Sequence, residues 1–253
     1  MNEHLFYDWL LMTAFILPAV VFVALFFIVA PYGRHSRSGW GPTINNKLGW
    51  MIMESTAPAV FLLCFISGPK SGSIAAIMFL AMWELHYLHR AFIFPFSLRG
   101  KARRMTLAVI GMGLLFNTMN AYLNGRYVFN FSGGYQADWL VGPRFITGAA
   151  IFIAGFIINR QSDWTLRNLR RGQDSGYRIP YGGLYRWVSC PNYFGEILIW
   201  VGWAIATWSL PGLAFAVWTA ANLAPRARSN QRWYREHFLD YPEERKALVP
   251  LLW

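Results

Sequence analysis

The fold class is indicated first by residues 48–67, which read LGWMIMESTAPAVFLLCFIS. The stretch has about the length that a helix needs to cross a bilayer, roughly 20 residues. Glu54 is its only charged residue. An ionisable group in hydrocarbon costs roughly 2.5–3.5 kcal/mol on insertion scales, so such residues usually serve a function. Glu54 is therefore the first candidate site residue.

The composition of the whole chain is that of a membrane protein. Of its 253 residues, 55% are hydrophobic and 14% are charged, whereas soluble domains carry about 25% charged residues. A net charge of +11 can indicate nucleic-acid binding. Here, however, the basic residues fall in the gaps between apolar runs, which indicates membrane topology and contact with lipid headgroups instead. We expect one domain, residues 1–253, with membrane lipids and no nucleic acid among its partners.

Apolar runs along the chain predict an all-α fold with seven transmembrane helices. The predicted spans are Trp9–Ala30, Leu48–Ser67, Ser73–Phe96, Met105–Leu123, Gly142–Asn159, Tyr193–Trp208 and Leu210–Pro225. The last two are short and are separated by a turn at residues 209–212, so we expect them to form a tight helical hairpin.

The distribution of basic residues predicts the orientation. With the amino terminus outside, alternation places all but three of the 23 Lys and Arg residues on one side, and the exceptions are Lys70, Arg126 and Arg144. The positive-inside rule makes the arginine-rich side cytoplasmic. We therefore expect a multi-pass integral membrane protein with a cytoplasmic carboxyl terminus, in the endoplasmic reticulum of a eukaryote or the inner membrane of a bacterium.

Glu54 and Tyr87 lie at similar depths in two spans that a short turn joins. At 1.5 Å rise per residue, each is roughly 10–13 Å from the cytoplasmic end of its helix, so both side chains can face one cavity. A buried carboxylic acid and a phenol can together donate hydrogen bonds to a carbonyl oxygen and stabilise an enolate. The alternative is that Glu54 forms a structural pair with His86, His89 or Arg90.

Other site classes find little support in the sequence. Residues 111–113 (GMG) do not continue into a dinucleotide-binding fingerprint, and no His or Cys spacing predicts a metal site. The segment from Asn159 to Asn192 is long for a simple connection. Its polar and aromatic residues leave a binding element and a plain loop equally open.

Five stretches carry a more specific pattern. They are residues 86–90 (HYLHR), 159–163 (NRQSD), 177–184 (YRIPYGGL), 192–196 (NYFGE) and the tail from Arg232 to Pro250. In order and spacing they resemble the membrane-bound steroid 5α-reductase family, and the similarity covers nearly the whole chain. The resemblance implies a seven-helix enzyme that takes a hydride from NADPH and reduces the 4,5 double bond of a 3-oxo-4-ene steroid.

The resemblance also implies roles for individual residues. Glu54 and Tyr87 would be the catalytic pair that holds the 3-oxo group. Trp200 would line the substrate pocket, together with Met53, which stands where mammalian members have Gln. The positions that match cofactor contacts are Arg34, Lys101, Asn159, Asp163, Arg170, Tyr177, Arg178, Asn192 and Tyr234. We expect a monomer in which cytoplasmic loops and the tail, at about 159–192 and 226–253, cover the NADPH.

Three alternatives differ in chemistry. The same hydride transfer could reduce another unsaturated lipid, such as an enoyl thioester or a polyprenol. The fold of isoprenylcysteine methyltransferases is related and would imply S-adenosylmethionine, although the patterns at 159–163 and 177–183 favour NADPH. A non-enzymatic sterol-binding membrane protein would use Glu54 only to anchor a polar headgroup.

Overall fold

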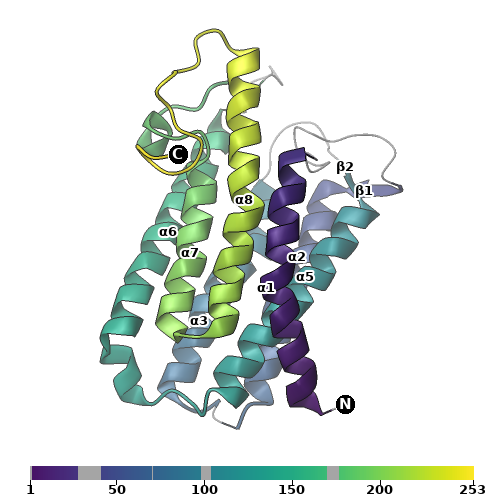
Figure 1. Cartoon of the computed structure of the whole chain (residues 1–253), viewed down its shortest axis with the longest axis vertical. Helices are drawn as coiled ribbons and strands as arrows, with labels where there is room; N and C mark the ends of the chain where they lie inside the picture. Colours follow the sequence, from purple (N-terminus) through teal and green to yellow (C-terminus); the bar gives the residue numbers. More distant parts are fainter. Residues whose placement is uncertain (1, 28–40, 70, 98–103, 170–176) are drawn as a thin grey trace.

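A computed structural model describes residues 2–27, 41–69, 71–97, 104–169 and 177–253. Its long helices stand side by side in one bundle, with the two chain ends at opposite ends of it (Figure 1). In the described ranges the long helices are α1 (Glu3–Phe27), α2 (Asn46–Ile66), α3 (Ile74–Leu88), α5 (Leu107–Arg126), α6 (Pro143–Asn168), α7 (Pro191–Thr207) and α8 (Leu210–His237).

The described part of each predicted apolar run lies in a helical segment apart from a few terminal residues, such as Met105 and Thr106, which belong to a short strand. Residues 28–30 of the first run lie outside the described ranges. The third run continues from α3 through a π-helical turn, His89–Ile93, into the short helix α4, Phe94–Ser97. Within the described parts of the chain, α1, α2 and α6 are the helices long and apolar enough to cross a membrane. The fold is therefore that of an all-α membrane protein.

Two of the predicted boundaries were wrong. Helix α6 runs nine residues beyond Asn159 to Asn168, and α8 runs on from Pro225 to His237. Much of what we expected to be loop at 159–192, and of the tail from 226, is therefore helix. Hydropathy detects only the part of a helix that lies in hydrocarbon, whereas the backbone hydrogen bonds continue equally well with polar side chains.

The hairpin between α7 and α8 is tighter than the sequence predicts. Trp208 has a left-handed backbone with φ +47°, and Ser209 caps α8 by accepting a hydrogen bond from the Gly212 N–H at 3.1 Å. Leu210, Pro211 and Gly212 thus form the first turn of α8 and not a loop. Proline is favoured in a first turn because it needs no hydrogen-bond donor there.

Helices α6 and α7 make the closest contact in the bundle, through glycines. A Cβ atom on Gly155 would lie 2.6 Å from the Ile199 nitrogen, and one on Gly195 would lie 2.6 Å from the Asn159 nitrogen. Gly148 and Gly202 repeat this contact toward the other end of the pair. Small residues let two backbones approach closely where lipid gives helices no hydrophobic reason to associate. The contact fixes the register of α6 on α7.

A short antiparallel ribbon ties α2 to α5. Strand β1 (Thr43–Asn45) pairs with β2 (Arg104–Thr106), and the two strands lead directly into these helices. The Arg104 side chain adds a hydrogen bond of 2.6 Å from Nε to the Thr43 hydroxyl. The ribbon therefore aligns the starts of α2 and α5, which pack along each other (Figure 1).

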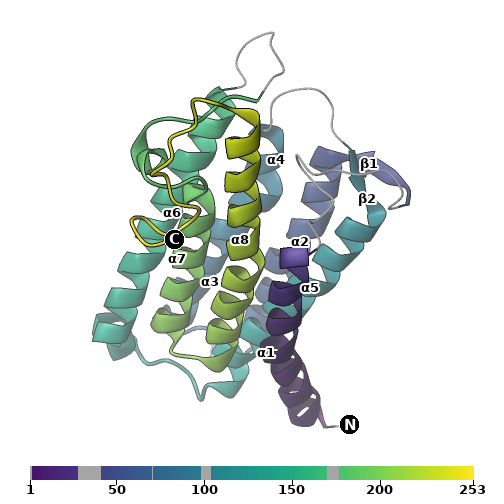
Figure 2. The ribbon, with the colours of Figure 1, turned by 45° about the horizontal axis from the view of Figure 1, so that its top comes forward.

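The carboxyl-terminal tail folds back over the end of the bundle at which α8 projects (Figure 2). The Ser189 N–H donates to the Lys246 carbonyl at 2.8 Å, and the Ser189 hydroxyl lies 2.7 Å from the Tyr241 hydroxyl. Burial raises the pKa of Tyr241 above its usual value. Arg245 is only 2% exposed and donates to the Pro180 carbonyl at 3.1 Å. The tail and residues 177–190 thus form one cap.

Candidate active site

Glu54 lies on α2, inside the bundle, with 8% of its surface exposed. Its charged neighbour is Arg90 in the π-helical turn after α3, with 3.8 Å between Arg90 Nη2 and Glu54 Oε1. The Arg90 guanidinium also lies over the rings of Trp50 and Phe94, at 5.1 and 5.0 Å from their centroids. The structural pairing considered from the sequence is thus present with Arg90, which contacts aromatic faces as well as the acid.

Tyr87 lies on α3, one turn before Arg90, and is 3% exposed. Its ring lies 4.9 Å from that of Trp83 and 5.6 Å from that of Trp200, between centroids. The Trp83 indole donates to the Ala57 carbonyl on α2 at 3.3 Å, which joins the two helices as predicted. Residues one turn apart share a helix face. Tyr87 and Arg90 therefore lie at neighbouring positions on one face of this segment, and Arg90 is the residue that pairs with Glu54.

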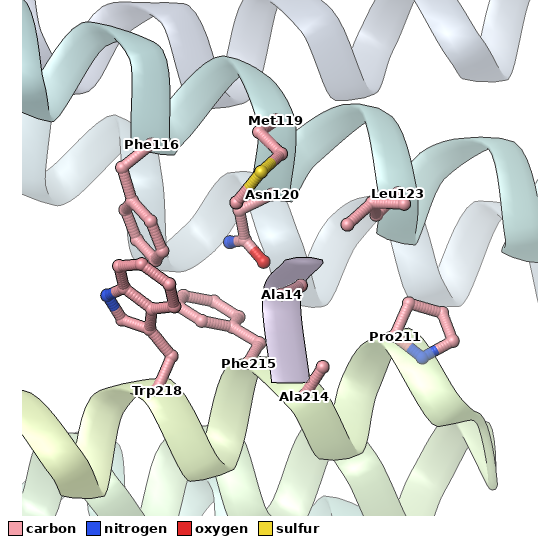
Figure 3. A pocket seen from close by; sticks show the side chains of 9 residues that line it. All are labelled: Ala14, Phe116, Met119, Asn120, Leu123, Pro211, Ala214, Phe215 and Trp218. Atoms are coloured by element: carbon pink, nitrogen blue, oxygen red, sulfur yellow. The ribbon is translucent and has the colours of Figure 1, made fainter. Parts of the chain in front are cut away.

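A row of asparagines lies on α5, which packs along α2. Asn117 donates to the Met53 carbonyl at 2.8 Å, and Asn124 accepts from the Trp203 indole at 2.8 Å. Between them, Asn120 is 5% exposed, and its Nδ2 has no hydrogen-bond partner among the described residues. Asn120 also lines a small pocket between α1, α5 and α8, where Phe116 and Trp218 face each other (Figure 3). Amides are costly in hydrocarbon unless they are bonded, so this row marks a polar interior.

Glu196 on α7 connects two groups of side chains. One oxygen, Oε1, lies 3.1 Å from His86 Nε2 and accepts from the Trp200 indole at 3.1 Å. The other oxygen, Oε2, accepts from the Asn159 amide at 2.9 Å. Trp200 belongs to the aromatic wall around Tyr87. Asn159 begins a second polar group in the carboxyl-terminal part of α6.

Three residues predicted to contact a cofactor are brought together in this second group. The Asn159 amide donates to the Asn192 carbonyl at 2.9 Å, and the Asn192 amide donates to Asp163 Oδ1 at 3.3 Å. Arg160 lies among them, with 3.8 Å between its Nη2 and Asp163 Oδ2, and it also bonds to Asn159 and His89. The closely packed glycines hold these residues of α6 and α7 face to face.

Tyr177, Arg178 and Tyr234 form a separate group beneath the cap. The Tyr177 ring lies 4.9 Å from that of Trp233, and Tyr234, which is 3% exposed, stacks on Tyr241 at 5.2 Å between centroids. The Tyr185 hydroxyl donates to the Ser162 carbonyl at 3.3 Å, which holds this segment against the end of α6. Arg178 is exposed beside them.

Three other predicted cofactor residues lie outside the described ranges. They are Arg34, Lys101 and Arg170.

Several buried polar atoms among the described residues have no hydrogen-bond partner. They include Asp163 Oδ2, Arg160 Nε and His86 Nδ1, which belong to the groups at Asn159 and Glu196. Such atoms are destabilising unless a ligand or water bonds to them. Their mixture of donors and acceptors fits a polar ligand such as a nicotinamide nucleotide. In the same ranges, no group of three or more His, Cys, Asp or Glu side chains could hold a metal ion.

The sequence did not assign three residues that the structure places in the site. Arg90 and His86 belong to a motif that was noted, but only as pairing partners, and Glu196 was not given a role. One signal was readable: Asn117, Asn120 and Asn124 recur at helical spacing within an apolar run, as expected for one polar stripe on a buried helix.

Comparisons with known proteins agree over most of the chain. A family model described as 3-oxo-5-alpha-steroid 4-dehydrogenase matches residues 103–253. A steroid 5-alpha-reductase DET2 of Gossypium hirsutum is 38% identical, covering 100% of this chain and 99% of its own. The DET2 protein of Arabidopsis thaliana is 37% identical, covering 99% of this chain and 98% of its own. The human 3-oxo-5-alpha-steroid 4-dehydrogenase 1 is 40% identical, covering 87% of this chain and 85% of its own.

Proposed function

The chain belongs to the 3-oxo-5-alpha-steroid 4-dehydrogenase family, whose members are oxidoreductases acting on CH–CH groups, and we propose that it reduces the 4,5 double bond of 3-oxo-4-ene steroids with NADPH. The product is the 5α-reduced 3-oxosteroid. The observation that carries the proposal is the buried ion pair of Glu54 with Arg90, one helical turn from the buried Tyr87. A mostly apolar substrate suits this interior, since its carbonyl is the group that needs polar partners.

The proposed chemistry is stabilisation of negative charge on the 3-oxo oxygen. Bound NADPH would supply a hydride to the β-carbon (C5) of the enone, and a proton from solvent would complete the reduction at C4. As the bond to C5 forms, electron density moves to the carbonyl oxygen, where Tyr87 and the acid form of Glu54 donate hydrogen bonds. Arg90 keeps a positive charge beside them. Preorganised donors in a site without water commonly contribute about 10²–10³ in rate each.

We assign cofactor binding to the polar groups at the cytoplasmic end of the bundle. Asn159, Asp163 and Asn192 would contact the polar parts of the nucleotide. They bond to one another, yet Asp163 Oδ2 and the neighbouring Arg160 Nε have no hydrogen-bond partner among the described residues. Tyr177, Arg178 and Tyr234 would contact it from beneath the cap. Arg34, Lys101 and Arg170 would add charge for its phosphates, since guanidinium and ammonium groups make strong charge-assisted contacts with them.

We further propose the membrane arrangement that the sequence predicts. All seven long helical segments would cross, with the amino terminus outside and the carboxyl terminus in the cytoplasm. Supporting this, the described arginines of the Asn159 group and of the cap lie at the end where α8 projects. The protein would act as a monomeric, single-domain, multi-pass enzyme, and its steroid would arrive through the surrounding lipid.

The test is turnover by the purified full-length protein in lipid nanodiscs. With NADPH and a 4-ene-3-one steroid, nicotinamide absorbance should fall at the rate at which mass spectrometry detects the 5α-reduced product. Parallel reactions with an enoyl thioester and a polyprenol identify a reductase of another lipid. Steroid binding without loss of absorbance would instead indicate a sterol-binding protein, and either result would contradict the steroid reductase.

A further inference from the structure

We propose that His86 is a positioning residue: by donating from Nε2 to Glu196, it holds the aromatic wall around Tyr87 in register with the amides that face the cofactor. The inference rests on the proposed function, because that function makes the aromatic wall around Tyr87 the substrate side of Glu196 and the Asn159 amide its cofactor side. Its geometry is independent of that function. His86 touches neither Glu54 nor the Asn159 group directly, so it acts through Glu196.

Three donors converge on the Glu196 carboxylate. Glu196 accepts from Trp200 and lies 3.1 Å from His86 Nε2 through Oε1, while its Oε2 accepts from Asn159. A carboxylate has about four acceptor sites, so three well-placed donors fix the rotamer of Glu196 and the positions of the three donating side chains. Loss of the His86 donor would leave Oε1 with Trp200 alone, so the carboxylate would rotate more readily about its terminal bond.

The consequences of such a rotation differ on the two sides. Trp200 is 1% exposed, and its ring lies 4.0 Å from that of Phe215 and 5.6 Å from that of Tyr87, between centroids. A shift of this indole would move the surface on which Tyr87 rests. Asn159 also donates to the Asn192 carbonyl, so a shift of its amide would disturb the cofactor side.

Among the described residues, the hydrogen-bonding contact of the His86 side chain is the one from Nε2 to Glu196. His86 is 1% exposed, its ring lies 4.8 Å from that of Trp200 and 5.1 Å from that of Tyr87, and its Nδ1 has no hydrogen-bond partner among the described residues. Two roles are therefore distinguishable by atom. Positioning uses Nε2, whereas direct contact with a ligand would use Nδ1.

Three substitutions separate these roles. His86→Phe keeps a ring and removes both nitrogens. His86→Gln places an amide near the position of Nε2, and His86→Asn places one near that of Nδ1. Tyr135→Phe is the matched control, because it removes a part-buried hydrogen bond, 2.7 Å from its hydroxyl to the Thr207 carbonyl, at the other end of the bundle.

The expected result is loss with His86→Phe and recovery with His86→Gln alone. Phe should lower kcat about ten- to hundredfold, the effect of one hydrogen bond to a charged acceptor, and leave KM for the steroid within about threefold. Gln should restore kcat to within about fivefold of the wild type, while Asn should remain as low as Phe. The control should keep both constants.

A second readout does not depend on turnover. NADPH affinity, measured by fluorescence titration, should weaken severalfold in His86→Phe and His86→Asn and recover in His86→Gln, because Glu196 also holds Asn159. Recovery by Asn in preference to Gln, or wild-type kcat and affinity in His86→Phe, would overturn the inference. A wild-type protein that binds NADPH but reduces no steroid would overturn the proposed function instead, and the affinity series would still decide the role of His86.

Discussion

Pro58 follows Glu54 by four residues on α2, so the proline ring stands where a backbone N–H would otherwise donate to the Glu54 carbonyl. Proline inside a helix removes this hydrogen bond and presses against that carbonyl. Proline at this position therefore favours a local departure from ideal helix geometry at the residue that carries the buried acid. Pro58 is itself buried.

We expect Pro58→Ala to restore the helix and to misplace the acid. Alanine favours a helix interior over proline by about 3 kcal/mol, so the melting temperature should not fall. Turnover should fall about tenfold, because small displacements of a positioned group are costly to catalysis. Pro18→Ala on α1 is the matched control, since Pro18 is also buried inside a helix but follows Ala14. Equal turnover in the two variants would show that Pro58 does not position the acid.

Glu54→Gln and Tyr87→Phe should each lose most turnover, about 10²–10³-fold, while keeping NADPH affinity. Glu54→Gln replaces the carboxylic acid of the proposed oxyanion site with an amide, a much weaker acid, and Tyr87→Phe removes the phenol hydroxyl. Both changes leave the Asn159 group untouched. Steady-state kinetics and NADPH fluorescence titration on the same preparations measure the two effects. Retained turnover in both variants would exclude the pair from the mechanism.

Asn192→Ala and Arg178→Ala should weaken NADPH binding about tenfold and change the steroid KM little. The first removes the donor to Asp163 Oδ1, and the second removes a cation from the edge of the cap. Titration of NADPH over a range of salt concentrations separates them, since screening reduces only the contribution of an exposed charge. Unchanged affinity in both would refute the assignment of the cofactor site.

Gly155→Ala should destabilise the protein by about 1–3 kcal/mol, the usual cost of overpacking. The new methyl group would meet backbone atoms of α7, with 2.6 Å to the Ile199 nitrogen, and backbone cannot move aside cheaply. Gly111→Ala on α5 is the control, because a Cβ atom at that position would have nothing within 4 Å among the described residues. Thermal denaturation in nanodiscs should show a lower midpoint for the first variant and an equal or higher one for the second.

Hydropathy and charge were sufficient to predict where the helices lie, because a helix in lipid must be apolar along its whole length. They could not predict that α6 and α8 extend beyond the apolar runs, where charged side chains are equally compatible with helix. The similar depths of Glu54 and Tyr87 follow from the rise per residue and a short connection, and both residues are buried in the structure.

The contacts around Glu196 could not be predicted in the same way. They depend on the register of α6 on α7, which glycine contacts set, and on the rotation of α3 that turns His86 toward α7. Neither can be calculated from periodicity along a single helix. Arg90 was likewise visible in the sequence, but its position over Trp50 and Phe94 depends on the π-helical turn, which shifts every later side chain around the helix axis.

The glycine-lined contact of α6 with α7 has a consequence for redesign of the pocket. Asn159 and Glu196 lie on two helices whose backbones are in close contact at glycines. A bulkier residue between α6 and α7 would therefore move these two residues apart. The opposite wall, formed by Met53 on α2 and the asparagines of α5, makes its contacts through side chains. These residues can be substituted one at a time. A change of preferred substrate is thus accessible from that wall, while the residues proposed to bind the nucleotide stay as they are.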